Sequence, residues 1–240
     1  MKDIKAIILD YGGTIDTGGR HWARVLREAY NASNVPITDE QFREAYVFGE
    51  RALAKAPIVK KDDDFRHLLL KKVDQEIAWL EYKGYWNASG LMREAARYDI
   101  ASFCDNFARE QTSRARAVIE TLSKTYKLVL VSNFYGNIHT VLAAYELDQF
   151  FPDIIESSVV GVRKPDPRIW KLGVKAAGCK AAQCCVVGDN FRKDIAPAAS
   201  IGCNTIWFKG EAWDANEQTD ETLPNAIITA IEQLPEALKK

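Results

Sequence analysis

Six polar residues stand at four separate places in the chain and have the side-chain types that phosphoryl transfer requires. In chain order they are Asp10, Thr14, Ser132, Lys164, Asp189 and Asp194. A carboxylate can attack phosphorus and form an aspartyl-phosphate, which divides one difficult displacement into two easier steps. The anionic nucleophile and the phosphate repel each other, so positive charge is needed between them. The set therefore indicates phosphoryl transfer assisted by a cation.

Each of these residue types has a role in that chemistry. Mg²⁺ prefers hard oxygen ligands, which Asp10, the carbonyl of Gly12 and Asp189 can supply. Lys164 adds a fixed positive charge beside the nucleophile and the phosphate. Ser132, together with nearby backbone N–H groups, can donate hydrogen bonds to the phosphoryl oxygens. We expect the substrate to bind at Ser132, Asn133, Lys164, Gly13 and Thr14, because these residues surround the predicted phosphate position.

Taken one at a time, these residues also fit structural roles. An Asp after a strand often forms a turn or caps a helix. Ser132 and Asn133 could cap the helix expected near Asn137, and Lys164 could be a solvated loop residue. Asp194 could simply be an acid in the first turn of a helix. The order of the set, with each group after its own predicted strand, favours the chemical interpretation.

Five short apolar segments have the composition of parallel strands that are covered on both faces. They are Lys5–Tyr11, Lys127–Asn133, Ile154–Val160, Cys184–Asp189 and Asn204–Phe208. Helical patterns occur at Arg114–Lys124, Asn137–Leu147, Pro167–Ala177, Lys193–Ser200 and about Leu223–Lys239. This alternation predicts an α/β fold with a doubly wound parallel sheet, in which sites form beyond the carboxyl ends of the strands.

The stretch between the first two predicted strands shows helical patterns and no convincing strand. Four helices are expected, over about Trp22–Tyr30, from Thr38, from Asp62 to Lys83, and over about Gly90–Arg109. The second opens with a capping box, since Gln41 follows three residues after Thr38. We therefore predict an α/β core domain of residues 1–16 and 110–240, interrupted by an α-helical domain of residues 17–109.

The composition is that of an ordinary globular protein. The chain has 240 residues and a mass of 27.0 kDa, with 47% hydrophobic and 27% charged residues. Its net charge of -1 gives no bulk attraction to nucleic acid or anionic lipid, so neither nucleic acid nor a membrane is a predicted partner. No apolar run approaches the roughly 18 residues that span a bilayer. The five cysteines form no C-x-x-C pair, which favours free thiols and a cytoplasmic location.

Four segments together resemble the motifs of the haloacid dehalogenase superfamily. The first is AIILDYGGT, the second LVLVSN, the third the lysine of GVRKPDPRIW, and the fourth GDNFRKDIAPA. The resemblance covers essentially the whole chain and implies a Rossmann-like core with a helical C1 cap. It also implies Asp10 as the nucleophile, Asp189 as a Mg²⁺ ligand, and Asp194 as a further ligand or a brace for the metal's water molecules.

One position departs from the pattern of the family's phosphatases. Those enzymes carry a second Asp two residues after the nucleophile as general acid and base, and this chain has Gly12 there. The backbone carbonyl that contacts the metal in the family survives, whereas the proton transfer does not. Ordinary monoester hydrolysis should then be slower by about 10²–10⁴-fold. Tyr11 should face away from the site, and Asp16 fits a hinge or helix cap better than a substitute acid.

The leading prediction is a Mg²⁺-dependent phosphatase that acts on a small phosphorylated metabolite through an aspartyl-phosphate, as a monomer or a homodimer. One alternative is a C–P bond hydrolase resembling phosphonoacetaldehyde hydrolases, which need a cap lysine for a Schiff base; Lys55, Lys60 and Lys61 are candidates. A second is a true 2-haloacid dehalogenase, which in the resembling enzymes carries Tyr at the position of Gly12 and needs no metal. The third is a catalytically impaired phosphate-binding protein.

Overall fold

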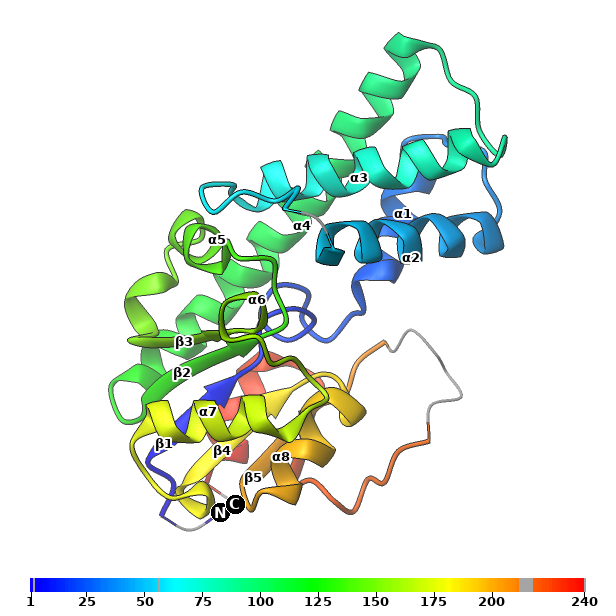
Figure 1. The fold of residues 1–240 in the computed structure, drawn as a ribbon. Coiled ribbons are helices and arrows are strands. Elements are labelled where there is room, and N and C mark those ends of the chain that lie inside the picture. The colour runs from blue at the N-terminus through cyan, green and yellow to red at the C-terminus, as the bar shows by residue number, and fades with distance from the viewer. Residues whose placement is uncertain (2, 56, 212–217, 240) are drawn as a thin grey trace.

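The computed structural model describes residues 1, 3–55, 57–211 and 218–239, and within them six parallel strands form one sheet (Figure 1). The strands are β1 (Ala6–Leu9), β2 (Lys127–Ser132), β3 (Asp153–Glu156), β4 (Cys184–Gly188), β5 (Asn204–Phe208) and β6 (Ala226–Ile228). Their order across the sheet is β3-β2-β1-β4-β5-β6. The predicted doubly wound α/β fold is confirmed, with one strand, β6, that the sequence pattern did not reveal.

Both faces of the sheet are covered. Successive strand residues point to opposite sides, so alternate residues of one strand pack in different clusters. On one face, Ile8 of β1 packs in a cluster with residues of α7 (Pro167–Ala177) and α8 (Ala196–Ser200). On the other face, Ile7 belongs to the large core cluster that includes residues of α4 (Gly90–Ser123). Burial on both sides explains why the strands are nearly continuous apolar runs in the sequence.

The cysteines follow the same alternation along β4. Cys184 lies in the cluster on the α7 face, and Cys185 lies in the cluster on the opposite face. All five cysteines are free thiols. Among the described residues, no helix combines the length and the apolarity that crossing a bilayer requires.

A helical segment separates β1 from β2 and lies above the sheet in Figure 1. It contains α1 (Trp22–Ala32), α2 (Asp39–Lys55), α3 (Phe65–Tyr82) and the first part of α4. Helix α3 packs against both α2 and α4, and α1 packs against α4. We call residues 17–109 the insert; their separation from the core as a domain stays a prediction.

Helix α4 differs from the prediction, since it is one helix from Gly90 to Ser123 and joins the insert to the core without a break (Figure 1). The sequence pattern predicts two helices here, one ending at Arg109 and one starting at Arg114. The residues between them contain no glycine or proline, so nothing stops the helix. Thr112 satisfies its hydroxyl within the helix by donating a 2.7 Å hydrogen bond to the carbonyl of Ala108.

Two further predictions are wrong, one in where a strand ends and the other in the type of element. The strand expected over Ile154–Val160 is confined to β3, because Ser157–Val160 form a short helix, α6, that ends at Gly161 with φ of 70°. The helix expected over about Leu223–Lys239 is instead β6 followed by two short helical turns. These turns are η4 (Ile231–Gln233) and α9 (Leu234–Ala237). Apolar residues in this segment pair with β5 or pack under the sheet, and their spacing imitated a helical face.

The remaining elements are short and connect the strands. They are α5 (Ile138–Ala144), η1 (Asp148–Phe150), η2 (Ala181–Gln183) and η3 (Phe191–Ile195). The last is a π-helical turn where the sequence pattern predicted the start of an ordinary helix at Lys193. Such turns occur often at functional sites, and this one immediately follows β4.

Candidate active site

The site forms at β1, where the order of the strands along the sheet reverses. Strand β1 lies between β2 and β4, and Leu9 pairs with Leu130 on one side and with Val187 on the other. Asp10 therefore follows β1 between the ends of its two neighbours. In a doubly wound sheet such a point leaves a crevice beyond the strand ends, where ligands bind.

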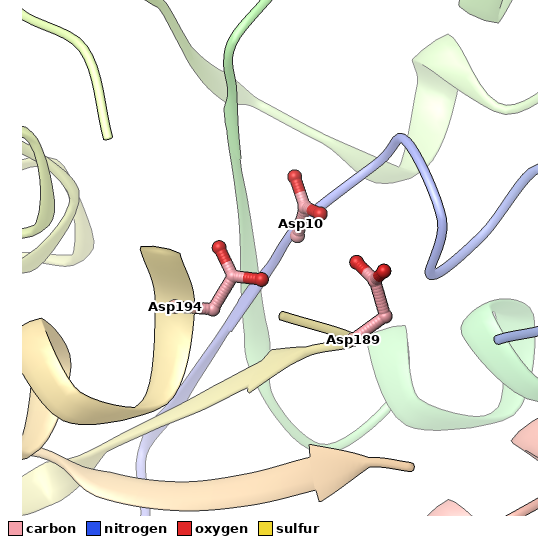
Figure 2. A group of neighbouring side chains, drawn as sticks. All are labelled: Asp10, Asp189 and Asp194. Carbon is pink, nitrogen blue, oxygen red and sulfur yellow. The ribbon is translucent and has the colours of Figure 1, made fainter. Parts of the chain in front are cut away.

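Three carboxylates converge at this point. Asp10 follows β1, Asp189 follows β4, and Asp194 lies in the π-helical turn η3. Figure 2 shows their side chains directed toward one another, and one oxygen of each lies within 4.8 Å of the others. Burial raises the pKa of Asp10 to about 6, with Lys164 opposing the shift and Asp194 adding to it. Burial, then Asp194 and Asp10, hold the pKa of Asp189 well above its usual value.

The buried ammonium group of Lys164 lies against this acidic cluster. Its Nζ donates a 2.5 Å hydrogen bond to Oδ1 of Asp10 and lies 2.9 Å from Oδ1 of Asp194. The same ammonium sits over the ring of Trp170, 4.6 Å from its centroid. Burial alone would lower the pKa of Lys164, but the two carboxylates outweigh it and raise the pKa. Lys164 therefore stays charged beside the predicted nucleophile.

The loop that carries Lys164 is fixed by Asn133. Its amide Nδ2 donates to the carbonyl of Lys164 at 3.1 Å, and its Oδ1 accepts from the backbone N–H of Lys164 at 2.9 Å. The sequence analysis expected Asn133 to bind substrate, whereas in the structure its amide group is engaged with Lys164. Ser132 ends β2, is buried and lines the same cavity.

The turn after Asp10 brings the backbone close to Asp189. Gly13 has φ of 96°, and a Cβ at this position would overlap the carboxylate of Asp189. Only glycine fits there, because the conformation and the close approach both exclude a side chain. The hydroxyl of Thr14 lies 3.4 Å from Oδ2 of Asp10 and 3.4 Å from Oδ1 of Asp189. The loop thus joins two members of the acidic cluster.

A second loop fixes Asp194. The backbone N–H of Asn190 donates a 3.0 Å hydrogen bond to Oδ2 of Asp194. A Cβ at Gly188 would lie 2.5 Å from the Cβ of Asp194, so the end of β4 and this side chain are in close contact. Oδ1 of Asp194 is buried and has no hydrogen bond of good geometry, although the Lys164 ammonium is near. Asp194 is thus held by the Lys164 ammonium at Oδ1 and by a backbone N–H at Oδ2.

The donor set fits a hard divalent cation. All three side chains offer carboxylate oxygens, which Mg²⁺ prefers over nitrogen or sulfur. Lys164 supplies one positive charge against three carboxylates, so the cluster can accept a further positive charge. Three members of the ligand set predicted from the sequence, Asp10, Asp189 and Asp194, lie together in the structure, and their role as ligands, with that of the Gly12 carbonyl, stays a prediction.

The two residues weighed as substitutes for the missing acid have other surroundings. Tyr11 is fully buried against Phe134 and does not line the cavity, in agreement with the expectation that it faces away. Asp16 lines the cavity, but both its oxygens are engaged. Oδ1 accepts from the N–H of Gly13 at 2.7 Å, and Oδ2 accepts from Nε1 of Trp22 at 2.8 Å. Burial raises the pKa of Asp16 to about 7 despite these bonds. These two hydrogen bonds join the loop after Asp10 to α1.

A cavity of about 650 Å³ extends from the acidic cluster to the insert. The core contributes Asp10, Ser132, Lys164, Asp189 and Asp194, and the insert contributes His21, Trp22, Tyr46, Glu50 and Lys72, among other residues. Sequence reasoning missed Glu50 and Lys72. A signal was present, because Lys72 and Glu76 are charged residues on the otherwise apolar face of α3.

The chain belongs to the haloacid dehalogenase-like hydrolases, whose family model matches residues 4–202. The insert after β1 is consistent with the C1 cap of that superfamily. A glyceraldehyde 3-phosphate phosphatase of Pyrococcus furiosus is 28% identical over 175 residues, which cover 72% of this chain and 68% of the relative. A protein of the same name from Methanothermobacter thermautotrophicus is 28% identical over 246 residues, 98% of this chain and 100% of the relative.

Solved structures agree with the fold. The putative HAD-hydrolase YfnB from Bacillus subtilis, which was solved bound to magnesium, aligns over 100% of both chains with a TM-score of 0.60. Its sequence identity is 19%, so this likeness supports the architecture alone. The chain is thus a hydrolase with a Rossmann-like core and a helical insert.

Proposed function

We propose that this protein is a Mg²⁺-dependent phosphatase that releases phosphate from a small phosphorylated metabolite. One observation carries the proposal: the buried Lys164 ammonium is 2.5 Å from Oδ1 of Asp10, within three converging carboxylates at adjacent strand ends. A charged lysine held on a buried carboxylate neutralises part of the charge that approaching phosphate must face. The two relatives described above are named as phosphatases, which supports the same reaction.

Asp10 is the proposed nucleophile. Lys164 occupies its Oδ1, which leaves Oδ2 to attack phosphorus. The new O–P bond forms as the bond from phosphorus to the leaving oxygen breaks, and this oxygen departs with the electron pair and takes a proton from solvent. A water molecule then attacks the phosphorus of the aspartyl-phosphate and gives a proton to solvent, while the O–P bond to Asp10 breaks and its electron pair restores the carboxylate. The Ser132 hydroxyl can donate to a phosphoryl oxygen, because Ser132 lines the cavity at the end of β2, the strand beside β1.

Asp10, Asp189, Asp194 and the carbonyl of Gly12 are the proposed Mg²⁺ ligands. Bound Mg²⁺ supplies positive charge that offsets the carboxylates and the phosphoryl oxygens. Asn133 is proposed to act through Lys164, which its amide holds by the main chain. Gly13 contributes space for Asp189, since its own N–H is already donated to Asp16. Thr14 lies between two of the acidic residues and is proposed to orient them.

The structure gives less support to the C–P bond hydrolase. Of the insert lysines weighed for a Schiff base, Lys55 lines the cavity but is exposed, and Lys60 and Lys61 do not line it. Among the described residues of the insert, the buried lysine that lines the cavity is Lys72. Burial would lower its pKa, but Glu50 and Glu76 outweigh burial and raise it, so the amine is protonated. A Schiff base requires the neutral amine.

A panel of phosphorylated metabolites, assayed for inorganic phosphate with MgCl₂, tests the proposal. We expect turnover of at least one small phosphate ester, loss of turnover in chelator, and loss of turnover in Asp10→Asn. Phosphate binding without turnover of any compound would overturn the proposal in favour of a binding protein. Chloride release from a 2-chloro acid that persists in chelator would overturn it in favour of a dehalogenase.

A further inference from the structure

A buried charged cluster lies in the insert, apart from the acidic site. Lys72 of α3 is 4% exposed, and Glu76, one turn later, is fully buried. The Lys72 ammonium donates a short hydrogen bond to Oε1 of Glu50 on α2 and lies 3.6 Å from Oε1 of Glu76. It also lies over the ring of Tyr46, 4.4 Å from the centroid. Burying such charges is costly, and apolar residues would hold helices together as well. A functional reason is therefore needed.

Glu50 is the member of this cluster that can contact a ligand. It lines the same cavity as Asp10 and Lys164, and its side chain is 40% exposed, whereas that of Lys72 is 5% exposed. Besides Lys72, the carboxylate accepts a 3.0 Å hydrogen bond at Oε2 from the hydroxyl of Tyr135, which follows β2 in the core. A carboxylate has about four acceptor sites, so two remain. Glu50 thus presents a fixed, partly used hydrogen-bond acceptor to the cavity.

The charge state of Glu50 is set by its partners. Burial would raise its pKa, but the Lys72 ammonium and the Tyr135 hydroxyl outweigh burial, and Lys193 adds to their effect, so the pKa is lowered. The group is an ionised acceptor near neutral pH. A hydroxyl can donate to it, whereas a carboxylate at the same place would meet a like charge. Two exposed cations of the core, Arg163 and Lys193, also line the cavity, and Lys193 is close enough to Glu50 to help lower its pKa.

We propose that Glu50 accepts hydrogen bonds from hydroxyl groups on the leaving group of the substrate, and that Lys72 and Tyr135 are positioning residues that hold its carboxylate. The proposal rests on the proposed phosphatase function and extends it to a class of substrate. That class is phosphate esters of small polyols or hydroxy-aldehydes, in contrast to phosphate esters that carry a carboxylate in the same place.

Three phosphate esters separate the contributions. Glycerol 3-phosphate carries hydroxyls, 3-phosphoglycerate has the same carbon skeleton with a terminal carboxylate, and phenyl phosphate has no hydroxyl. In the wild type we expect kcat/KM for glycerol 3-phosphate to exceed that for 3-phosphoglycerate by about 10-fold or more. A hydrogen bond to a charged group is worth about 10- to 100-fold in such a comparison. Glu50→Gln should lower kcat/KM for glycerol 3-phosphate by about 10-fold, mainly through KM, and leave phenyl phosphate within about twofold.

Variants of the positioning residues provide a second readout. Tyr135→Phe removes only the hydroxyl that orients Glu50, and Lys72→Met removes its ammonium partner; both should reduce the preference for glycerol 3-phosphate, and Lys72→Arg should restore part of it. Lys71→Met is the matched control, because Lys71 pairs with Asp63 and does not line the cavity. It should leave the preference unchanged.

Failure of the inference is distinct from failure of the proposed function. If the wild type releases phosphate from none of a wide panel, the proposed function fails. If it releases phosphate but Glu50→Gln changes all three esters equally, or none, the role of Glu50 is overturned. Loss of fold in Lys72→Met, seen by circular dichroism, still leaves Glu50→Gln and Tyr135→Phe to decide.

Discussion

The amide group of Asn133 and the main chain of Lys164 exchange two hydrogen bonds, one from Nδ2 to the carbonyl at 3.1 Å and one from the N–H to Oδ1 at 2.9 Å. This pairing ties the end of β2 to the loop before α7, two segments that are 31 residues apart. The Lys164 side chain then reaches Asp10 and Asp194 from a fixed backbone. Asn133 therefore positions a charge that it does not itself touch.

Asn133→Ala should impair turnover through Lys164. Both main-chain groups of Lys164 lose their partner, and the ammonium is then held less well on Asp10. We expect kcat to fall by about 10-fold, with a smaller change in KM, as for a misplaced catalytic group. Steady-state kinetics on one phosphate ester measure the effect. Asn137→Ala is a control, since Asn137 is a buried amide whose Nδ2 donates to the carbonyl of Asp63 in the insert. Equal loss in both variants would indicate a general packing defect.

The core of the site could be predicted from the sequence because strand ends reveal it. Buried parallel strands are short apolar runs, and the residue after each run lies at one edge of the sheet. Asp10 and Asp189 follow such runs and Ser132 ends one, and the structure brings the three together. Asp194 lies five residues after Asp189, in η3. No knowledge of packing was needed for these residues.

The insert could not be predicted to the same depth. Glu50 and Lys72 meet because α2 packs against α3, and the contact joins residues 22 positions apart on separate helices. Helical periodicity locates each helix but does not specify which turns face each other. The predictions of two helices at α4 and of a helix at β6 were wrong for a related reason. The local sequence patterns there are compatible with more than one structure, and tertiary packing decides which one forms.

Asp189→Asn should remove the proposed metal site without disturbing its shape. The substitution keeps the volume beside Gly13, where a larger group would not fit. It replaces an anionic ligand with a neutral amide, so we expect Mg²⁺ affinity to fall at least about 10-fold. Isothermal titration calorimetry with Mg²⁺ alone measures this, and Mg²⁺ should raise the Tm of the wild type but not of the variant. Asp166→Asn is the control, because Asp166 caps α7 and pairs with Arg168 away from the cluster. Equal Mg²⁺ affinity in wild type and Asp189→Asn would contradict the ligand assignment.

Glu76 should make stability depend on pH. Burial raises its pKa from 4.5 to about 7, although Lys72 and the Tyr30 hydroxyl oppose the shift. Between these pH values the unfolded chain has lost the proton and the folded protein retains it. The contribution of Glu76 to the free energy of unfolding therefore falls as pH rises through this window, by up to about 1.4 kcal/mol per pH unit. In Glu76→Gln the side chain is neutral at every pH, so this part of the pH dependence of the free energy of unfolding should be absent.

Denaturant unfolding of wild type and Glu76→Gln at pH 5 and pH 8 measures the difference. The free energy of unfolding of the variant minus that of the wild type should be more positive at pH 8 than at pH 5, by up to ~3 kcal/mol, because only the wild type loses stability over this range. Glu94→Gln is the control, since Glu94 is a half-exposed residue of the insert that pairs with Arg97. A wild-type and Glu76→Gln difference that is the same at both pH values would show that Glu76 is ionised throughout.

Gly12→Asp tests the position at which the family's phosphatases carry their general acid. A Cβ on Gly12 would meet no atom within 4 Å, and its φ lies outside the left-handed region, so a side chain fits without strain. If the missing acid limits the rate, the loss of rate grows with the basicity of the leaving group. Phenyl phosphate should then be hydrolysed much faster than an alkyl phosphate by the wild type.

Gly12→Asp should raise the alkyl rate selectively, by up to roughly 10²-fold where the carboxyl reaches the leaving oxygen. Gly12→Asn adds similar volume without an acid and should not raise it, and Asp10→Asn should be inactive toward both esters. Fast alkyl turnover by the wild type that Gly12→Asp does not improve would mean that the substrate or a residue of the insert already supplies the proton.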